Sequence, residues 1–377
     1  MKLVMTLLVR NEADIVRANL DYHLAQGVDF VIVTDHGSED GTSEILREYE
    51  RMGVAQVHRD EEPGHHQSRR VTRMAELARV EHGADWVIHN DADEFWWPQL
   101  GSLRDVFASL PARYAQIVVA RRNFRPLPDP EELAGVRPFY SRLNYRETNS
   151  LSLVGQPKIA HRPLANVVVA PGNHSISPAG LPAVPGGGLL EIFHFPMRSY
   201  EQFERKVVQI GLGYERVPDR SPGVGRDQLE LLGLQRAGRL REYYDGLVLD
   251  DAALQRGMRA GAIVLDRRLE HFICDLPAVG TDGARADAPF AGQLLERMMG
   301  ALAEVEQSRE ELAGLRTERE RASARIGELH AEVREVSAAL EQTKDELRST
   351  SEALSLLRSS RLLRHTAWLR RLYYSSR

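Results

Sequence analysis

The chain has 377 residues, and 42% of them are hydrophobic, which is enough to build the core of one large domain or two modest ones. Its formal net charge of −5 excludes the broad positive field expected of a protein that wraps nucleic acid. The single cysteine, Cys274, excludes an internal disulfide framework and a cysteine metal site, which fits a reducing compartment. We therefore expect a globular, cytoplasmic protein.

The apolar run from Leu3 to Val9 predicts a buried strand. It is short, meets charged residues from Arg10 onward and lacks a small-residue cleavage site, so it does not resemble a signal peptide. No apolar stretch approaches the roughly 20 residues that span a bilayer, so we expect any membrane contact to be peripheral.

The first hundred residues alternate between strand and helix patterns. We predict strands at 3–9, 30–33, 54–57 and 85–90, with helices at 13–26, 42–53 and 66–82 between them. This alternation predicts an α/β fold with a parallel, doubly wound sheet. Ligands bind beyond the carboxyl ends of such strands, so the polar segments at 10–12, 34–42, 59–70 and 90–94 should meet in one crevice.

The remainder of the chain is less regular. We expect strands at 117–121 and 167–170, a helix at "RSYEQFERKVVQI", and a linker rich in Pro and Gly at 277–290. The predicted organisation is a first domain at 1–215, a helical extension at 216–276, this linker, a coiled coil at 291–357 and a basic amphipathic tail at 358–377.

The coiled-coil prediction depends on two seams of seven-residue spacing. The first holds Val305, Leu312, Arg319, Ile326, Val333, Leu340, Leu347 and Leu354; the second holds Ser308, Leu315, Ala322, Leu329, Val336, Thr343, Thr350 and Leu357. A solvated single helix would leave this apolar surface in water, so we expect homo-oligomerisation. Arg319 at a core position favours a defined register and few strands.

The tail at 358–377 combines arginines with Leu, Trp and Tyr and contains no acid. A basic amphipathic helix of this kind suits the anionic surface of a membrane, and the alternative is a frayed tail or a helix that packs on a partner protein.

The stretch "WVIHNDADEFWW" carries Asp91, Asp93 and Glu94 where a strand ends. Like charges so close together need a compensating partner, and carboxylate oxygens suit Mg²⁺ or Mn²⁺. Such an ion binds few protein ligands and completes its shell with water and phosphate, so diphosphate is the expected companion. The alternative is structural, with Asp93 or Glu94 capping a following helix.

Asp35 follows an apolar strand, where its carboxylate is suited to accept a hydrogen bond from a nucleobase or a ribose hydroxyl. For Asp40 or Thr42 we favour a helix-capping role. The sequence contains no G-x-G-x-x-G and no Walker pattern, so a dinucleotide-binding dehydrogenase or a P-loop enzyme is a less favoured interpretation.

The order "LLVRNEADIVRANLDYHLAQGVDFVIVTDHGSEDGT", an arginine-bearing helix and "WVIHNDADEFW" resembles family 2 glycosyltransferases with the GT-A fold, in particular a bacterial branch with a DxDEF form of the DxD motif. The resemblance covers about residues 1–215 and is most specific in the first hundred. One departure is Asp35-His36-Gly37-Ser38, because common members read "DDGS" and the second acid is absent here.

The resemblance implies a nucleotide-diphosphate sugar donor and Mn²⁺ or Mg²⁺. Its implied donor-binding residues are Arg10, Asn11, Asp35, Asp91 and either Arg69 or Arg73. Its implied metal ligands are Asp91 and Asp93, with His174 or His194 as a third ligand or a diphosphate contact; a lone histidine is more often structural. Lys158, Arg162 and Lys206 are available to offset phosphate charge.

The implied reaction is an inverting displacement at the anomeric carbon, catalysed with Asp93 at the metal and a general base. Glu191 in "LLEIFHFP" lies near the spacing at which family members place the base, and Glu147 is an earlier candidate. The expected acceptor is a glycan, a glycolipid or a polysaccharide, handled in the cytoplasm or on the inner face of the membrane.

Two other readings stay open. A nucleotidyltransferase also uses paired acids and a metal, but it would normally carry a glycine-rich basic loop where this chain has "VRNEAD". A non-catalytic coiled-coil scaffold with an inactive GT-A domain is the other, and the retention of both DxD acids counts against it.

Overall fold

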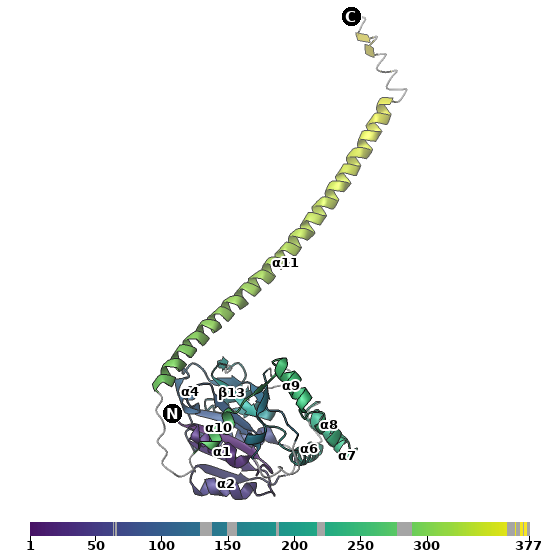
Figure 1. Ribbon diagram of the computed structural model, residues 1–377. Coiled ribbons are helices and arrows are strands. Elements are labelled where there is room, and N and C mark those ends of the chain that lie inside the picture. Colours follow the sequence, from purple (N-terminus) through teal and green to yellow (C-terminus); the bar gives the residue numbers. More distant parts are fainter. Residues whose placement is uncertain are drawn as a thin grey trace. The chain divides into compact units, whose positions relative to one another are not determined.

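The computed structural model describes residues 1–62, 64, 66–128, 138–148, 157–185, 188–216, 223–276 and 289–359, followed by residues 366, 370–371 and 373–374. Contacts within the chain divide it into two compact units, Met1–Met299 and Gly300–Arg377. The first unit holds an α/β fold and the second consists largely of one long helix (Figure 1). The boundaries that we expected inside the first unit stay predictions.

The first part of the chain forms the predicted alternation of strands and helices. Its elements are β1 (Leu3–Val9), α1 (Val16–Ala25), β2 (Phe30–Asp35), α2 (Thr42–Arg51), β3 (Ala55–Arg59), α3 (Gln67–Val80) and β4 (Trp86–Asp91). Gly27 ends α1 with a φ of 93°, and a Cβ there would lie 2.7 Å from Cβ of Arg104. Only glycine satisfies both the backbone angle and the close approach.

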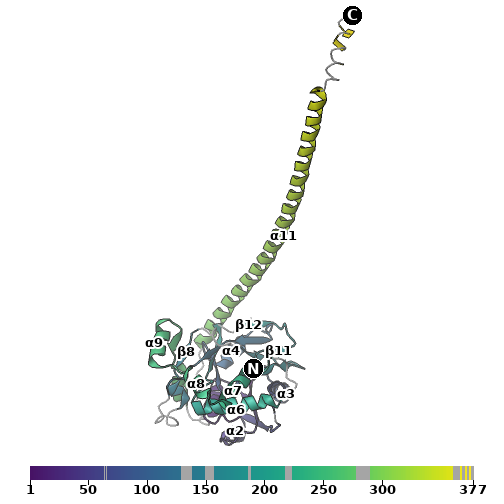
Figure 2. The same ribbon diagram turned by 90° about the vertical axis from the view of Figure 1, so that its right-hand side faces the viewer.

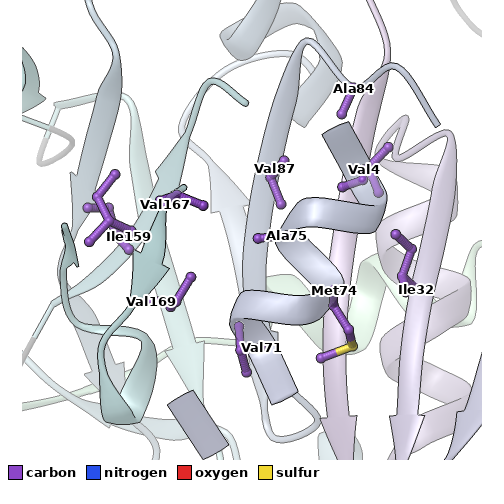
Figure 3. Packing of buried hydrophobic residues seen from close by; sticks show 12 residues of the cluster. Val4, Ile32, Val71, Met74, Ala75, Ala84, Val87, Ile159, Val167 and Val169 are labelled. Carbon is purple, nitrogen blue, oxygen red and sulfur yellow. The ribbon is translucent and has the colours of Figure 1, made fainter. Parts of the chain in front are cut away.

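Among the described residues, the central sheet has seven strands in the order β12 (Ala183–Pro185), β6 (Gln116–Val119), β9 (Lys158–His161), β4, β1, β2 and β3. Strands β3, β2, β1 and β4 are parallel, as expected. Helix α3 packs on one face, where Val71 and Met74 contact the cluster that includes Val4, Ile32 and Val87 (Figure 3).

The opposite face of the same strands is also covered. Successive strand residues point to opposite faces, so the neighbours of Val4, Ile32 and Val87 point away from α3. These neighbours are Met5, Val31 and Ile88, and all three are fully buried. Because both faces are covered, these strands are continuous apolar runs, and the prediction of a buried first strand at Leu3–Val9 is confirmed.

The other half of the sheet, formed by strands after the first hundred residues, is mixed, so the predicted parallel arrangement does not extend to it. Strand β9 (Lys158–His161) is antiparallel to both β4 and β6 (Gln116–Val119), and β12 (Ala183–Pro185) is parallel to β6. Apolar periodicity reports the burial of a strand and not its direction, so the sequence does not reveal this reversal.

A second, three-stranded sheet follows the acidic stretch. Strand β13 (Leu190–His194) lies between β5 (Glu94–Pro98), to which it is antiparallel, and β7 (Arg121–Asn123), to which it is parallel. The helix-capping alternative for Asp93 or Glu94 is therefore wrong, because the aromatic residues that follow continue as a strand, which their side chains favour.

The remaining elements of the first unit are α4 (Leu103–Ser109), α5 (Phe139–Arg142), β8 (Tyr145–Glu147), β10 (Val168–Val169), the 3₁₀ turn η1 (Pro171–Asn173), β11 (Ile176–Ser177), α6 (Tyr200–Glu215), α7 (Arg226–Arg236), α8 (Leu240–Asp245), α9 (Asp251–Arg259), β14 (Ile263–Leu265) and α10 (Arg268–Cys274). Figure 2 shows α6 beside α7, and the two helices are in contact. Helix α6 confirms the helix expected at "RSYEQFERKVVQI".

Helix α11 (Pro289–Ser359) extends over 71 residues. It confirms that the region expected to form a coiled coil is helical. Most of the expected linker, 277–288, and most of the expected tail lie outside the described residues. Within the described part of the chain, no helix combines the length and the apolar character that crossing a membrane requires.

Candidate functional site

A cavity of about 470 Å³ opens at the carboxyl ends of β1, β2 and β4. All four polar segments that we expected to meet there contribute to its wall, through Arg10, Glu12, His36, Gly64, Arg70, Asp91 and Asp93. Further lining residues come from later in the chain and include Arg121, Lys158, Gly172, His174, His194, Lys206, Gln209 and Tyr214. The predicted convergence on one crevice is confirmed.

The turn that carries the two aspartates is held by Asn19 of α1. Its amide nitrogen donates to the carbonyls of Ala92 at 3.0 Å and Glu94 at 2.7 Å. Its side-chain oxygen accepts a hydrogen bond from Asn90 at 3.0 Å. Asn19 and Asn90 are buried, so these bonds fix the turn in place.

Asp93 and His194 face each other across this turn. His194 ends β13, and its Nε2 lies 3.8 Å from Oδ2 of Asp93. On the other side of the ring, Nδ1 lies 2.8 Å from the side-chain oxygen of Asn123 and donates to it. Burial lowers the pKa of His194 well below its usual value, so the ring is neutral and Nε2 offers its lone pair toward Asp93.

Lys206 of α6 supplies positive charge at the same point. Its ammonium donates to Oδ2 of Asp93 at 2.5 Å and lies 3.6 Å from Oε1 of Glu12. Burial acts to raise the pKa of Asp93, but the charges of Lys206 and its neighbours outweigh burial, and the pKa lies well below its usual value. Asp93 is therefore ionised, and its buried charge is compensated.

Glu94 extends the acidic cluster into the interior. Its Oε1 lies 3.2 Å from Nζ of Lys158 and 3.3 Å from Nη1 of Arg121. Among the described residues, no donor reaches its buried Oε2. Burial raises the pKa of Glu94 to about 7, because the charged form loses its water.

These groups fit a divalent cation. One ligand atom each from Asp93, Glu94 and His194 lies within 4.8 Å of the others. Carboxylate oxygens together with a neutral imidazole suit Mn²⁺ and, less selectively, Mg²⁺. The unpartnered Oε2 of Glu94 and the lone pair of His194 are the two observations that favour an ion here.

Asp91 and His174, also expected as ligands, occupy another part of the wall. Asp91 accepts hydrogen bonds from Lys158 and, at 3.1 Å, from Nδ2 of Asn173. His174 donates from Nδ1 to the carbonyl of Pro157 at 2.9 Å. A Cβ at the neighbouring Gly172 would lie 2.2 Å from Nε2 of His174, so this turn requires glycine for close approach.

Asn11 and Asp35, expected to bind the nucleoside, do not line the cavity and instead accept hydrogen bonds from residues that follow β2. Asp35 accepts hydrogen bonds from the backbone of Ser38 at 3.0 Å and from the hydroxyl of Ser43. Asn11 accepts one from the backbone of Glu39 at 2.8 Å. The two side chains thus connect the ends of β1 and β2 to residues 38–43, while Arg10 lines the cavity.

Arg69 and Arg73 are exposed and do not line the cavity. They are four residues apart on α3 and share its solvent face. Arg70 lies on the cavity side and is buried, and it donates to Asp60 at 2.8 Å. The sequence identified the correct helix but not the arginine that its periodicity turns inward.

Glu191 and Glu147, the two candidate bases, also lie outside the cavity lining. Glu191 accepts from Arg122 at 3.2 Å and from Arg268 at 2.7 Å. Glu147 accepts from Arg125 at 2.8 Å. Both carboxylates are thus paired with arginines, and neither lines the cavity.

Some lining residues were given no individual role in the sequence analysis. Glu12, in the predicted strand-end segment 10–12, has a raised pKa from burial and pairs with the buried Arg198. Gln209 has a side-chain Nε2 without a hydrogen-bond partner among the described residues, and it reaches the site because α6 returns to the strand ends. A helical pattern on α6 predicts which residues face inward, but not which cavity they face.

Comparison with known proteins adds one match over part of the chain. Residues 5–175 match the sequence model of glycosyltransferase family 92, which supports a glycosyltransferase over this region. No curated protein matches the sequence significantly.

Solved structures give distant similarities. TarS 1–349 of S. aureus in complex with UDP-GlcNAc is 13% identical, covering 72% of this chain and 90% of its own, with a TM-score of 0.36. Glucosyl-3-phosphoglycerate synthase from Mycobacterium tuberculosis, in complex with Mn²⁺, UDP and phosphoglyceric acid, is 18% identical over 43% of this chain and 55% of its own, with a TM-score of 0.26. Similarities at this level assign no function.

Proposed function

We propose that the chain is a metal-dependent glycosyltransferase with a GT-A domain, which moves a sugar from a nucleotide-diphosphate sugar to a glycan, glycolipid or polysaccharide acceptor with inversion. The family match over residues 5–175 supports the reaction class. The observation that carries the proposal is the pair of Asp93 and the neutral His194 in a cavity that lysine and arginine also line.

Asp93 and His194, with Glu94 beside them, would hold Mn²⁺ or Mg²⁺, and Asp91 and His174 are the further candidates on the same wall. The bound cation would supply positive charge to the diphosphate leaving group. Arg10 and Arg70 line the cavity from the strand-end side and are placed to attract the negatively charged donor. Lys206 is the cation that reaches Asp93 from α6.

In the proposed reaction, the acceptor hydroxyl oxygen bonds to the anomeric carbon as the bond from that carbon to the diphosphate oxygen breaks. The hydroxyl proton passes to a base. Because Glu191 and Glu147 are paired with arginines outside the cavity, we propose structural roles for both.

We also propose that α11 forms a coiled coil that makes the chain a homo-oligomer. The exposed apolar residues at seven-residue spacing support this assembly. Peripheral contact of residues 358–377 with the inner face of a membrane, in a protein that is otherwise cytoplasmic, is supported by the sequence of that tail alone.

A thermal-shift and hydrolysis screen tests the proposed activity. Purified protein is incubated with Mn²⁺ and a panel of nucleotide sugars, and both the melting temperature and the slow release of nucleotide are measured. The proposal predicts stabilisation and hydrolysis with one donor class, and neither in Asp93→Asn. Equal stabilisation of both proteins, or none in either, would favour the inactive scaffold.

A further inference from the structure

The apolar seam of α11 lacks cover within the described part of the second unit. Its described large residues, from Leu312 to Leu357, are each between 43% and 70% exposed. The whole helix is about 105 Å long at 1.5 Å per residue. An apolar stripe of this length in water disfavours a single helix, so the stripe requires a partner.

We propose that this partner is a second copy of the chain, aligned parallel and in register, so that α11 forms a two-stranded coiled coil. The inference rests on the proposed homo-oligomer and specifies its orientation and number of chains. Three features of α11 favour this pairing: the polar positions of its seam, the charges on the flanks of the seam and the β-branched residues within it.

Polar residues interrupt the two seams at Ser308, Arg319, Thr343 and Thr350. In a parallel, in-register pair each of these lies opposite its own copy, so polar layers coincide. In an antiparallel pair, a first-seam residue faces the second seam of the other chain, and Arg319 would be set against a different and mostly apolar layer. Burying an unmatched charge is costly, which favours the parallel register.

The flanks of the seam differ in charge. The residues that precede the first seam include Glu311, Glu318, Glu332 and Glu346, with Arg325 as the one basic member. The residues that follow the second seam include Arg316, His330, Lys344 and Arg358, and no acid occupies this flank from Arg316 to Arg358. The two edges are therefore largely acidic and basic, respectively.

A parallel pair brings unlike flanks together, whereas an antiparallel pair brings each flank against itself. In the parallel register Glu311 lies across from Arg316 of the other chain, and no acid faces an acid. An antiparallel pair sets glutamates against glutamates along much of one edge and cations against cations on the other. Like charges in such positions destabilise the pair.

The number of chains follows from the first seam. Arg319 needs to extend its guanidinium past the interface to water, which a two-stranded coil allows more readily than a wider one. Three of the eight first-seam positions, Val305, Ile326 and Val333, are β-branched as parallel dimers prefer, and Leu329 on the second seam follows their preference for leucine. Both Met1–Met299 units would then join the coil at the same end, so that two sites can act on one repeating acceptor.

Disulfide formation between single cysteines tests the orientation. Cys274 is first replaced by Ser, and Leu312→Cys on the first seam or Leu357→Cys on the second is introduced in that background. The two positions are about 68 Å apart along the helix, far beyond the Cα separation of up to about 7 Å that a disulfide allows. Each variant alone, in a glutathione buffer, should give more than half covalent dimer.

An antiparallel pair would instead cross-link only when the two variants are mixed, and that result would overturn the inference. Sedimentation equilibrium of the Cys274→Ser protein should give the mass of two chains, against 42.5 kDa for one. A mass of one or of three chains would also overturn it. Neither readout uses activity, so a parallel dimer without sugar transfer would refute the proposed function and leave this inference intact.

Charge exchange provides a second test if a cysteine variant fails to fold. Glu311→Arg and Arg316→Glu each place like charges opposite each other in a parallel homodimer, and a mixture relieves both. When differently tagged chains of the two variants are mixed in equal amounts, heterodimers should form at least about three quarters of the dimers, above the statistical half. A statistical distribution would contradict the parallel register.

Discussion

Strand β13 carries two candidate functional residues, and the structure gives them contrasting surroundings. Glu191, its second residue, lies between Arg122 and Arg268 beyond the cavity lining. His194, its last residue, lines the cavity and faces Asp93. Residues three apart on a strand point to opposite faces, so a linear distance from the DxD motif cannot tell which of the two reaches the site.

The contrast also separates two kinds of buried charge. The carboxylate of Glu191 is compensated by two guanidinium groups within the fold. Next to the other end of the strand, Oε2 of Glu94 is buried without a hydrogen-bond partner among the described residues, and Nε2 of His194 faces Asp93. Buried acceptor atoms without donors beside a cavity favour a cation site.

The largest expected effect is on Asp93. Replacing Asp93 by Asn removes the central carboxylate of the proposed metal group, and we expect sugar transfer to fall at least about 1,000-fold, as measured by nucleotide release. The matched control is Glu191→Gln, for which activity should remain within about tenfold. Comparable losses of activity in both variants would indicate that Glu191 takes part in the reaction and would contradict the contrast between Glu191 and His194.

The next effect concerns the other end of β13. We expect His194→Gln to weaken Mn²⁺ binding about 100-fold in titration calorimetry, because the ring nitrogen that faces Asp93 is lost. His174→Gln keeps the cavity wall but lies outside the cluster of three ligand atoms, so it should change the affinity less than fivefold. The reverse ranking would identify His174 as the ligand.

A smaller effect is expected on stability. Glu191→Ala leaves Arg122 and Arg268 without their shared carboxylate, and we expect the free energy of unfolding to fall by about 2 kcal/mol in urea, the partial exposure of both arginines moderating the loss. Mn²⁺ affinity below the melting transition should be unchanged. Unaltered stability would show that the arginine pairs do not anchor β13.

The smallest effect is a pH dependence beneath the neighbouring strand β5. Burial lowers the pKa of His23 from 6.5 to about 4, and the backbone N–H of Trp96 donates to its Nε2. Between pH 6.5 and pH 4 the unfolded chain takes up a proton that the folded chain does not. The contribution of His23 to the free energy of unfolding is therefore fully present above pH 6.5 and is lost as the pH falls toward 4. From pH 6.5 to pH 5 the loss from His23 is about 1.5 kcal/mol.

Denaturation at several pH values checks this prediction. His23→Gln should flatten the dependence on pH, while the exposed His271→Gln should leave it as in the unaltered chain. A slope that does not change in His23→Gln would mean that other groups account for the acid sensitivity.

The fold of the first hundred residues could be predicted because its signals are local. The run Leu3–Val9 and the apolar strands at Phe30 and Trp86 are buried on both faces, and the polar segment after each one reaches the same crevice. Strand order in the rest of the sheet depends on the direction in which β9 and β6 return, and no residue pattern records that direction.

The candidate site was predictable at the strand ends and in part beyond them, because His194 and Lys206, both named from the sequence, also line the cavity. Asp91 and Asp93 lie on the cavity wall, as expected from their strand-end position. The sequence analysis named Arg69 and Arg73 instead of Arg70, which lines the cavity. A shift of one residue rotates a helical side chain by about 100°, so choosing the wrong neighbour places the arginine on another face. The role of Glu94 was hard to predict because its burial depends on the strand β5 that it begins. The contact of Lys206 with Asp93 forms only when α6 folds over the strand ends.

The most direct test of the central claim is pulsed electron paramagnetic resonance of Mn²⁺ bound to the protein. The account predicts a hyperfine coupling from one imidazole nitrogen, which persists in His174→Gln and disappears in His194→Gln at Mn²⁺ concentrations that keep the site filled. A spectrum from bound Mn²⁺ without nitrogen coupling, or a coupling that survives in His194→Gln, would contradict a cation held between Asp93 and His194.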